Sequence, residues 1–316
     1  MKSTLPFISA VLFINTLFLP HTFAEDYTRW ELPEGAKMRL GKGTIHNTIG
    51  KPIYHFSPDS SQLAVFTSIG IWIYDTQTGK EIRLLTAHHK GQSDDTALSP
   101  DWELFASSRD SWEHHEIQVG NTHTGKIKTT LEGHTKRVTS VTFRPDGKML
   151  ASGDHEGVIR LWHVSTGEYR QIRTPHKSVN VVAFSPDGRT IMSRKDRDFR
   201  LWDIETGQLK NILKETKQIN NITFSPDGQL LVGSNNSEIL LWDTDTGKIR
   251  TRFNAPGWNE LLAFSPDGKT LAYAGGNNYT VQLRDPYTGE LKNTFSGDPE
   301  YIKMTEISDG VPKLVD

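Results

Sequence analysis

Histidine is the residue type in this chain that first suggests chemistry. Six of its twelve histidines crowd between residues 88 and 134, namely His88, His89, His114, His115, His123 and His134. The stretch 112–116 combines imidazole and carboxylate groups that could hold a metal ion, but a metal site needs three or four ligands that converge. His114 and His115 are adjacent, and adjacent residues of a strand point to opposite faces. We therefore expect no metal site and no cofactor.

Aspartate recurs once in every repeat of the chain, at Asp59, Asp101, Asp146, Asp187, Asp227 and Asp267. A catalytic pair departs from the symmetry of a repeat, whereas these residues follow it, so we interpret them as structural turn residues. The sequence has no Gly-x-Ser-x-Gly elbow and no phosphate-binding loop that ends in Gly-Lys-Ser/Thr. We expect no catalytic residue.

Two short phrases recur in phase along most of the chain. The first, Phe-Ser-Pro-Asp or a close variant, has its second residue at Ser57, Ser99, Arg144, Ser185, Ser225 and Ser265. The second, Thr-Gly, ends at Gly79, Gly125, Gly167, Gly207, Gly247 and Gly289. Because the copies lie 40 to 46 residues apart in a constant order, they define a structural repeat.

Each copy predicts four short strands, as residues 177–213 illustrate. The first predicted strand, residues 179–184, alternates and is rich in β-branched residues. Ser-Pro-Asp-Gly follows as a tight turn, because proline fixes φ and glycine accepts a positive φ. The other predicted strands are residues 190–193, 199–203 and 209–213. One such unit cannot bury apolar residues on both faces, whereas radially stacked blades can, so the repeat predicts an all-β propeller of four-stranded blades.

The third strand of several blades carries a phrase with a family resemblance. Leu201-Trp202-Asp203 and Leu241-Trp242-Asp243 resemble the signature of WD-repeat propellers, and Gly133-His134 resembles the Gly-His of that family. The resemblance implies a hydrogen-bonded tetrad of His, Ser, Asp and Trp in a blade. Carried over by position, the tetrad of blade three, the third copy of the repeat, comprises His134, Ser152, Glu156 and Trp162. The tetrad of blade four comprises His176, Ser193, Asp196 and Trp202. Blade five keeps only Trp242 clearly, whereas blades two and six have Gly120 and Arg284 instead of Trp.

The two ends of the chain contain the pieces of a further blade. Residues 29–35 mimic residues 201–207, and Ser308 lies one repeat after Ser265. We expect residues 27–41 and 301–316 to form one blade jointly, which would close a seven-bladed ring and satisfy the backbone groups of an open edge. The alternative is six blades with disordered tails.

The first 24 residues have the pattern of a secretory signal peptide. Lys2 supplies a short positive region, an apolar run follows, and the small residues Thr22 and Ala24 lie at the two positions that a signal peptidase reads. The run is shorter than the roughly 20 residues that cross a bilayer, which disfavours an uncleaved anchor. We expect cleavage after Ala24, an exported periplasmic or secreted protein, no membrane span after cleavage, and a single domain over residues 25–316.

The charge is nearly balanced, with 36 Lys and Arg against 38 Asp and Glu, and no cysteine is present. Nucleic-acid binding needs a dense basic surface, so we expect no nucleic-acid partner. A chain without disulfides is stabilised by its core alone. We expect a monomer.

The function predicted from these features is recognition. In the family, the loops from fourth to first strand and from second to third strand gather on one face, which we call the loop face; the opposite face is the turn face. The candidate binding residues of the loop face combine aromatic and cationic side chains, which are typical interface anchors. They are Arg109, Trp112, His114, His115, Lys136, Arg137, His155, Lys195, Arg197, Trp258 and Tyr279. We predict a non-enzymatic scaffold that binds a protein or peptide; a propeller hydrolase, lactonase or sugar-binding protein with a site at the central channel is the alternative.

Overall fold

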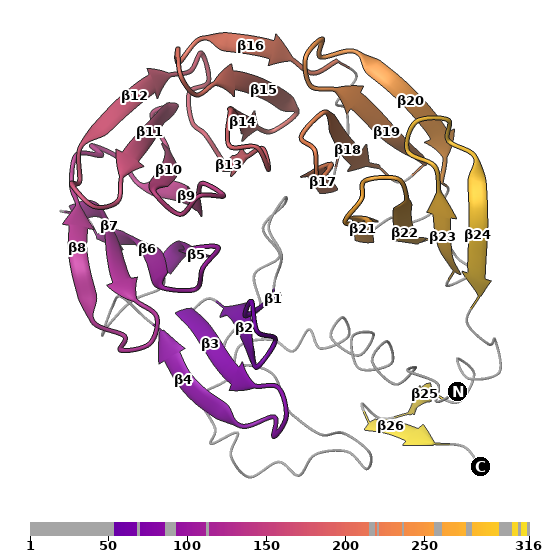
Figure 1. The fold of residues 1–316 in the computed structure, drawn as a ribbon, viewed down its shortest axis with the longest axis horizontal. Coiled ribbons are helices and arrows are strands. Elements are labelled where there is room, and N and C mark those ends of the chain that lie inside the picture. Colours follow the sequence, from indigo (N-terminus) through magenta and orange to yellow (C-terminus); the bar gives the residue numbers. More distant parts are fainter. Residues whose placement is uncertain are drawn as a thin grey trace.

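The strands of this protein form a propeller. The computed structural model describes residues 54–67, 70–85, 93–111, 114–214, 219, 221–235, 237–255, 261–275, 280–296, 305–308 and 311–314. Within these residues there are six four-stranded antiparallel sheets and one two-stranded sheet. The six sheets, which we number as blades one to six along the chain, lie around an arc with their first strands innermost (Figure 1). The predicted all-β propeller of four-stranded blades is confirmed.

The strand bounds of the first three blades are as follows. Blade one comprises β1 (Tyr54–Phe56), β2 (Gln62–Thr67), β3 (Gly70–Asp75) and β4 (Glu81–Leu85). Blade two comprises β5 (Ser93–Leu98), β6 (Leu104–Ser111), β7 (His114–Asn121) and β8 (Ile127–Leu131). Blade three comprises β9 (Val138–Phe143), β10 (Met149–Asp154), β11 (Val158–His163) and β12 (Tyr169–Arg173).

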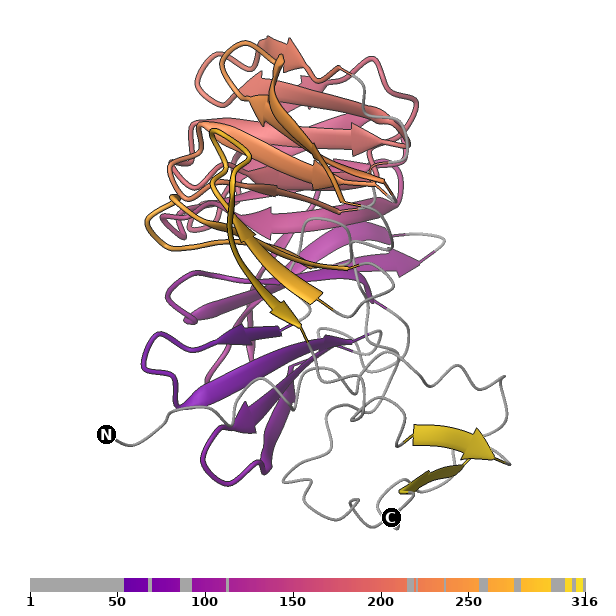
Figure 2. The ribbon, with the colours of Figure 1, turned by 90° about the vertical axis from the view of Figure 1, so that its right-hand side faces the viewer.

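The later blades repeat this plan, and Figure 2 shows their strands edge-on, running from one face of the ring to the other. Blade four comprises β13 (Val181–Phe184), β14 (Thr190–Lys195), β15 (Asp198–Asp203) and β16 (Leu209–Ile212). Blade five comprises β17 (Asn221–Phe224), β18 (Leu230–Ser234), β19 (Glu238–Asp243) and β20 (Ile249–Asn254). Blade six comprises β21 (Leu261–Phe264), β22 (Leu271–Gly275), β23 (Thr280–Arg284) and β24 (Leu291–Ser296).

The first turn of blade four shows why the repeat phrase builds a hairpin. The hydroxyl of Ser185 donates to Oδ1 of Asp187 and accepts the N–H of Thr190 at 2.9 Å. Gly188 has a φ of 68°, a conformation that a residue with a Cβ rarely adopts. The turn therefore fixes the register of β13 against β14.

The second turn uses the Asp that follows Trp202. Oδ1 of Asp203 accepts the N–H of Thr206 at 2.7 Å and its hydroxyl at 2.8 Å. These bonds lower the pKa of the Asp203 carboxyl, because hydrogen bonds to the ionised form favour that form. The predicted strands of blade four agree with β13–β16 to within two residues.

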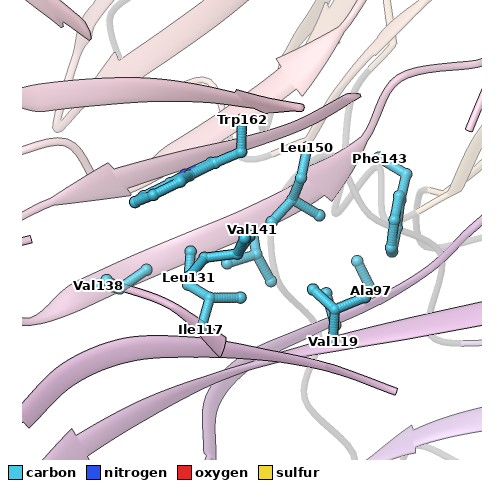
Figure 3. Packing of buried hydrophobic residues seen from close by; sticks show 10 residues of the cluster. Ala97, Ile117, Val119, Leu131, Val138, Val141, Phe143, Leu150 and Trp162 are labelled. Carbon is cyan, nitrogen blue, oxygen red and sulfur yellow. The ribbon is translucent and has the colours of Figure 1, made fainter. Parts of the chain in front are cut away.

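The hydrophobic core lies between neighbouring blades. Figure 3 shows Ile117, Val119 and Leu131 of blade two against Val141, Leu150 and Trp162 of blade three, and these side chains are almost completely buried. Fully burying an aliphatic or aromatic side chain of this size contributes roughly 1.5–3 kcal/mol. Each blade is therefore stabilised mainly by the blades beside it.

Polar side chains also connect the innermost strands. Oδ2 of Asp95 in β5 accepts the N–H of Val141 in β9 at 2.7 Å. One blade further on, the hydroxyl of Ser140 accepts the N–H of Val182 at 3.2 Å. These bonds align the first strands of blades two, three and four around the centre of the ring.

The extra residues of blade two do not form the predicted loop. They lengthen β6 and β7 to eight residues each, with Ser111 paired to His114. Arg109, His114 and His115 therefore lie on strands, where the continued ladder keeps their backbone N–H and C=O groups paired. Trp112 lies outside the described residues.

The C-terminal segment contains a hairpin of β25 (Thr305–Ser308) and β26 (Val311–Leu314), which pair only with each other among the described strands. The predicted strand that ends near Ser308 is present, and the next strand begins at Val311, two residues earlier than Lys313. The predicted segments 1–24 and 27–41 lie outside the described residues. Within the part of the chain that is described, no helix has the length and apolarity to cross a membrane.

Candidate binding surface on the loop face

Blade three contains a complete hydrogen-bonded tetrad that anchors the loop face. The indole N–H of Trp162 donates to the Ser152 hydroxyl at 2.8 Å, and that hydroxyl lies 2.6 Å from Nε2 of His134. Nδ1 of His134 lies 2.7 Å from Oδ2 of Asp154. The predicted members His134, Ser152 and Trp162 thus lie in one hydrogen-bonded chain.

The predicted fourth member, Glu156, is wrong. Asp154, at the end of β10, takes that place, and Glu156 is exposed and accepts the Thr135 hydroxyl at 2.9 Å. The reason is geometric: Ser152 and Asp154 are two residues apart on one strand, so their side chains share a face. Oδ1 of Asp154 also accepts the N–H groups of Glu156 and Val158, each at 2.9 Å, which closes the following loop.

Burial controls the charge of this tetrad. It lowers the pKa of His134, and the nearby Arg160 guanidinium lowers it further against the opposing effect of Asp154. Burial raises the pKa of Asp154, but the hydrogen bonds from His134, Val158 and Glu156 together with the charge of His134 outweigh burial, so this pKa is also lowered. A neutral His134 with its proton on Nδ1 can donate to the Asp154 carboxylate and accept the Ser152 proton on Nε2, and Nη1 of Arg160 lies 2.6 Å from the same Nδ1.

Blade four has a looser version of the tetrad. The indole N–H of Trp202 donates to the Ser193 hydroxyl at 2.8 Å, as predicted, and Nδ1 of His176 lies 3.4 Å from Oδ2 of Asp198. The predicted Asp196 is wrong: it is exposed, with a φ of 53° in the turn between β14 and β15. Nε2 of His176 is buried and makes no hydrogen bond with the described residues.

Blade five has no serine to accept the indole N–H of its tryptophan. Gly233 occupies the position of Ser152 and Ser193, and a Cβ there would lie 2.9 Å from the ring of Trp242. The indole N–H of Trp242 donates instead to the backbone carbonyl of Lys214 at 2.7 Å. The prediction that blade five keeps only Trp242 of the four residues agrees with this arrangement.

Blade two lacks the tetrad tryptophan and fills its place differently. A Cβ on Gly120 would lie 2.4 Å from the ring of Phe105, so Phe105 occupies the volume that an indole takes in blade three. Ser107, which corresponds to Ser152, is buried, and its hydroxyl has no hydrogen-bond partner among the described residues. Phe105 therefore replaces a polar anchor with an apolar contact.

The loops of blades three and four are tied to one another. The N–H of His155 donates to the carbonyl of Arg137 at 3.0 Å, and the N–H of Thr174 donates to that of Gly157 at 2.9 Å. A Cβ on Gly157 would lie 1.9 Å from the His176 carbonyl oxygen, so the two loops are in direct contact. The segments 132–137, 154–158, 173–178 and 194–200, which we call the loop cluster, form a preorganised surface.

The loop cluster is rich in cations, with eight Lys and Arg against five Asp and Glu in its four segments. The predicted Lys136, Arg137, His155 and Arg197 are exposed there, and Lys195 is half-buried with Nζ 3.4 Å from Asp196. Arg173 and Lys177 are also exposed on the cluster, although the sequence reasoning missed them. Arg173 ends β12 and Lys177 follows His176. Their nearness in sequence to the predicted tetrad histidine could have indicated that they belong to the same surface.

Five of the six other predicted binding residues have no described side chain. Trp258 and Tyr279, like Trp112, lie outside the described residues, and the side chains of Arg109 and His114 are not described. His115 is half-buried on β7. Among the described residues, no group of three or more His, Asp or Glu side chains could hold a metal ion.

The six described blades, together with the tryptophan-centred tetrads of blades three and four, define this protein as a β-propeller with internal repeats. The family described as "WD domain, G-beta repeat" matches residues 125–163, 167–203 and 207–243, which run from β8 of blade two to β19 of blade five. Within residues 125–243 the chain therefore carries WD repeats.

Several curated proteins are similar over part of this chain. WD repeat-containing protein slp1 of Schizosaccharomyces pombe is 30% identical over 42% of this chain and 26% of its own length. Periodic tryptophan protein 2 homolog of the same organism is 32% identical over 35% of this chain and 13% of its own length. Small ribosomal subunit protein RACK1 of Caenorhabditis elegans is 34% identical over 22% of each. The matches thus span about a quarter or less of these relatives.

Proposed function

We propose that this WD-repeat propeller is a non-enzymatic scaffold that binds a protein or peptide partner through the loop cluster of blades three and four. The observation that carries the proposal is that backbone hydrogen bonds connect loops of the cluster while basic side chains on it are exposed. Lys136, His155, Arg173 and Lys177 make no ion pair with a described side chain. A surface whose loops are already ordered loses little conformational entropy when a partner binds.

Capture of a partner from native extract by the immobilised full chain tests this proposal. Lys136→Glu combined with Lys177→Glu reverses the charge of two exposed residues and is expected to abolish capture of any partner that the unaltered chain retains. Lys269→Glu, on the turn face of blade six, is the matched control and is expected to leave capture unchanged. Equal capture by all three proteins contradicts the proposed surface.

We also propose that the chain is exported and loses residues 1–24. The support is the sequence of those residues, whose positive start, apolar run and small residues before Ala24 match a signal peptide. The relatives include proteins named for pre-rRNA processing and for the small ribosomal subunit, and these names lend export no support. Mass spectrometry of the protein from its native source tests the proposal: an N-terminus at Glu25 is expected, and an intact leader rules out cleavage.

We further propose that residues 27–41 and 301–316 form a seventh blade between blades six and one. Two apolar faces support it. Tyr54 of blade one is 38% exposed, whereas Val141, Val182 and Ile222 at the same position of other blades are 0–2% exposed against the preceding blade.

Blade six has the complementary exposed face. Val281 and Phe295 are 36% and 54% exposed, whereas their counterparts Ile159 and Ile172 in blade three are 0% and 4% exposed. A seventh blade would cover both faces at once. The hairpin of β25 and β26 supplies two of its four strands in the order that the repeat requires.

A further inference from the structure

Blade three departs from the repeat at both of its turns. The described first turns of the other blades carry serine, whose hydroxyl donates to the Asp two residues later, in Ser57, Ser99, Ser185, Ser225 and Ser265. The described second turns of the other blades begin with an Asp or Asn that accepts the N–H three residues later, in Asp75, Asn121, Asp203, Asp243 and Asp285. Blade three has Arg144 and His163 at these positions. Blade three therefore lacks the serine hydroxyl of the first turn and the Asp or Asn of the second, although Asp146 still accepts the N–H of Lys148 at 2.9 Å.

Arg144 cannot make the hydrogen bond of the turn serine, and it contacts the neighbouring blade instead. Its Nε donates to the carbonyl of Gly188 in blade four at 2.9 Å, and its Nη1 lies 3.2 Å from Oδ2 of Asp146. The backbone of the turn is kept, since the N–H of Gly147 donates to the Arg144 carbonyl at 2.8 Å. The guanidinium is thereby held in place at the junction of blades three and four.

His163 likewise leaves the turn backbone intact, because its carbonyl accepts the N–H of Gly167 at 2.8 Å. Its imidazole is exposed and makes no hydrogen bond with the described residues. Neither substitution is required by the fold, since serine and aspartate build the same turns in blade four.

The two departures meet in one pocket. A half-open pocket of about 810 Å³ lies between blades three and four on the turn face and is lined by both Arg144 and His163. Its floor includes the buried side chains of Leu161 and Ile204. The volume lies within the range of roughly 300–1,000 Å³ that is usual for ligand sites.

The rim of the pocket carries both donors and acceptors. The guanidinium of Arg189 and the carboxylate of Glu205 are exposed and make no ion pair with a described side chain. Tyr169 lines the same rim and is 45% exposed. Arginine and imidazole groups bind a carboxylate through charge-assisted hydrogen bonds, and Glu205 can accept the N–H groups of an extended main chain.

From this arrangement we propose that the pocket binds an extended peptide segment in which an acidic side chain lies beside an aliphatic one. The acidic side chain binds Arg144, His163 and Arg189, and the aliphatic side chain packs on Leu161 and Ile204. The site is on the face opposite the loop cluster, so it is independent of the function proposed above. In blade three, two residues that would stabilise the turns are thus replaced by residues that bind the peptide. Binding sites commonly have lower local stability for this reason.

Immobilised hexapeptides provide the test. One set carries Asp or Glu at its third position followed by Leu, Ile or Val, and the matched set carries Asn or Gln instead of the acidic residue. The full chain is expected to bind members of the acidic set and to lose that binding with the amide set. Equal binding to both sets overturns the proposal, and so does equal affinity for a free dicarboxylate such as glutarate.

Variants separate recognition from folding. Arg144→Ser combined with His163→Asp restores the residues of the other blades, so Tm is expected to stay the same or to rise while peptide affinity falls about tenfold to a hundredfold. Arg189→Ser, which removes a guanidinium without altering a turn cap, is expected to weaken binding at unchanged Tm. Lys269→Ser, at the matching position of blade six, is the control and is expected to change neither. Unaltered affinity in both pocket variants overturns the proposal.

Discussion

Oδ2 of Asp154 lies 2.7 Å from Nδ1 of His134, and both side chains are fully buried. Because the same carboxylate also accepts two backbone N–H groups through Oδ1, its loss would leave several buried donors without a partner. We expect Asp154→Ala to lower the free energy of unfolding by about 3 kcal/mol, because each buried donor left without a partner costs roughly 1–3 kcal/mol. Urea unfolding followed by tryptophan fluorescence measures this change. Glu156→Ala is the control, with an expected effect below about 0.5 kcal/mol; a larger loss for Glu156 than for Asp154 would contradict the assignment.

Stability should depend on the charge of the tetrad histidines. Burial lowers the pKa of His134 and of His176 in the folded chain below the usual value of about 6.5, so the unfolded chain binds more protons below that pH. Their contribution to stability is complete above about pH 6.5 and is lost as the pH falls. We expect the free energy of unfolding to decrease between pH 7 and pH 5, a window above that of the turn carboxylates. His134→Asn should flatten this dependence, and an unchanged slope would refute the role of His134.

Two serines at equivalent positions should respond differently to the same substitution. The hydroxyl of Ser193 accepts the indole N–H of Trp202, so Ser193→Ala leaves a buried donor unpaired and is expected to cost about 1–3 kcal/mol. The hydroxyl of Ser107 has no partner among the described residues, so Ser107→Ala is expected to be neutral or stabilising. Thermal unfolding of the two variants under one set of conditions checks this. A similar loss in both would mean that Ser107 is anchored after all.

Deletion of residues 301–316 tests the proposed closure of the ring. If these residues cover the exposed faces of blades one and six, their removal should lower Tm by several degrees, since about 1 kcal/mol shifts Tm by roughly 2–4 °C in a domain of this size class. Tyr54→Ser and Phe295→Ser should each be destabilising in the full chain and nearly neutral in the deleted chain. A deletion that leaves Tm unchanged contradicts the seventh blade.

The strands of this propeller could be predicted because each turn is built by local physics. Pro186 presets the backbone, Asp203 caps the turn that follows it, and Gly207 takes a positive φ of 72°, so their spacing along the chain marks where strands end. None of these features depends on a distant residue. The same locality explains why the bounds of β13 to β16 agree with the pattern so closely.

The site was harder to predict because it depends on contacts between segments. Glu156 and Asp196 fit the spacing of the family, yet Asp154 and Asp198 approach the histidines. A test for side chains that share a strand face would have selected Asp154, since it lies two residues from Ser152. No pattern in the sequence indicates that the extra residues of blade two lengthen β6 and β7, because polar residues suit an exposed ladder and a loop alike.

The bond from Trp242 to the backbone carbonyl of Lys214 has a consequence for variation at the surface. In blade three the corresponding loop is held by the side chain of His134, so that position can accept few substitutions. In blade five the tryptophan is held by the backbone carbonyl of Lys214, so the exposed side chain of Lys214 takes no part in holding it. Position 214 can therefore change its charge, size or chemistry while the tryptophan beneath it stays in place, which makes it a point where new specificity can arise without loosening the ring.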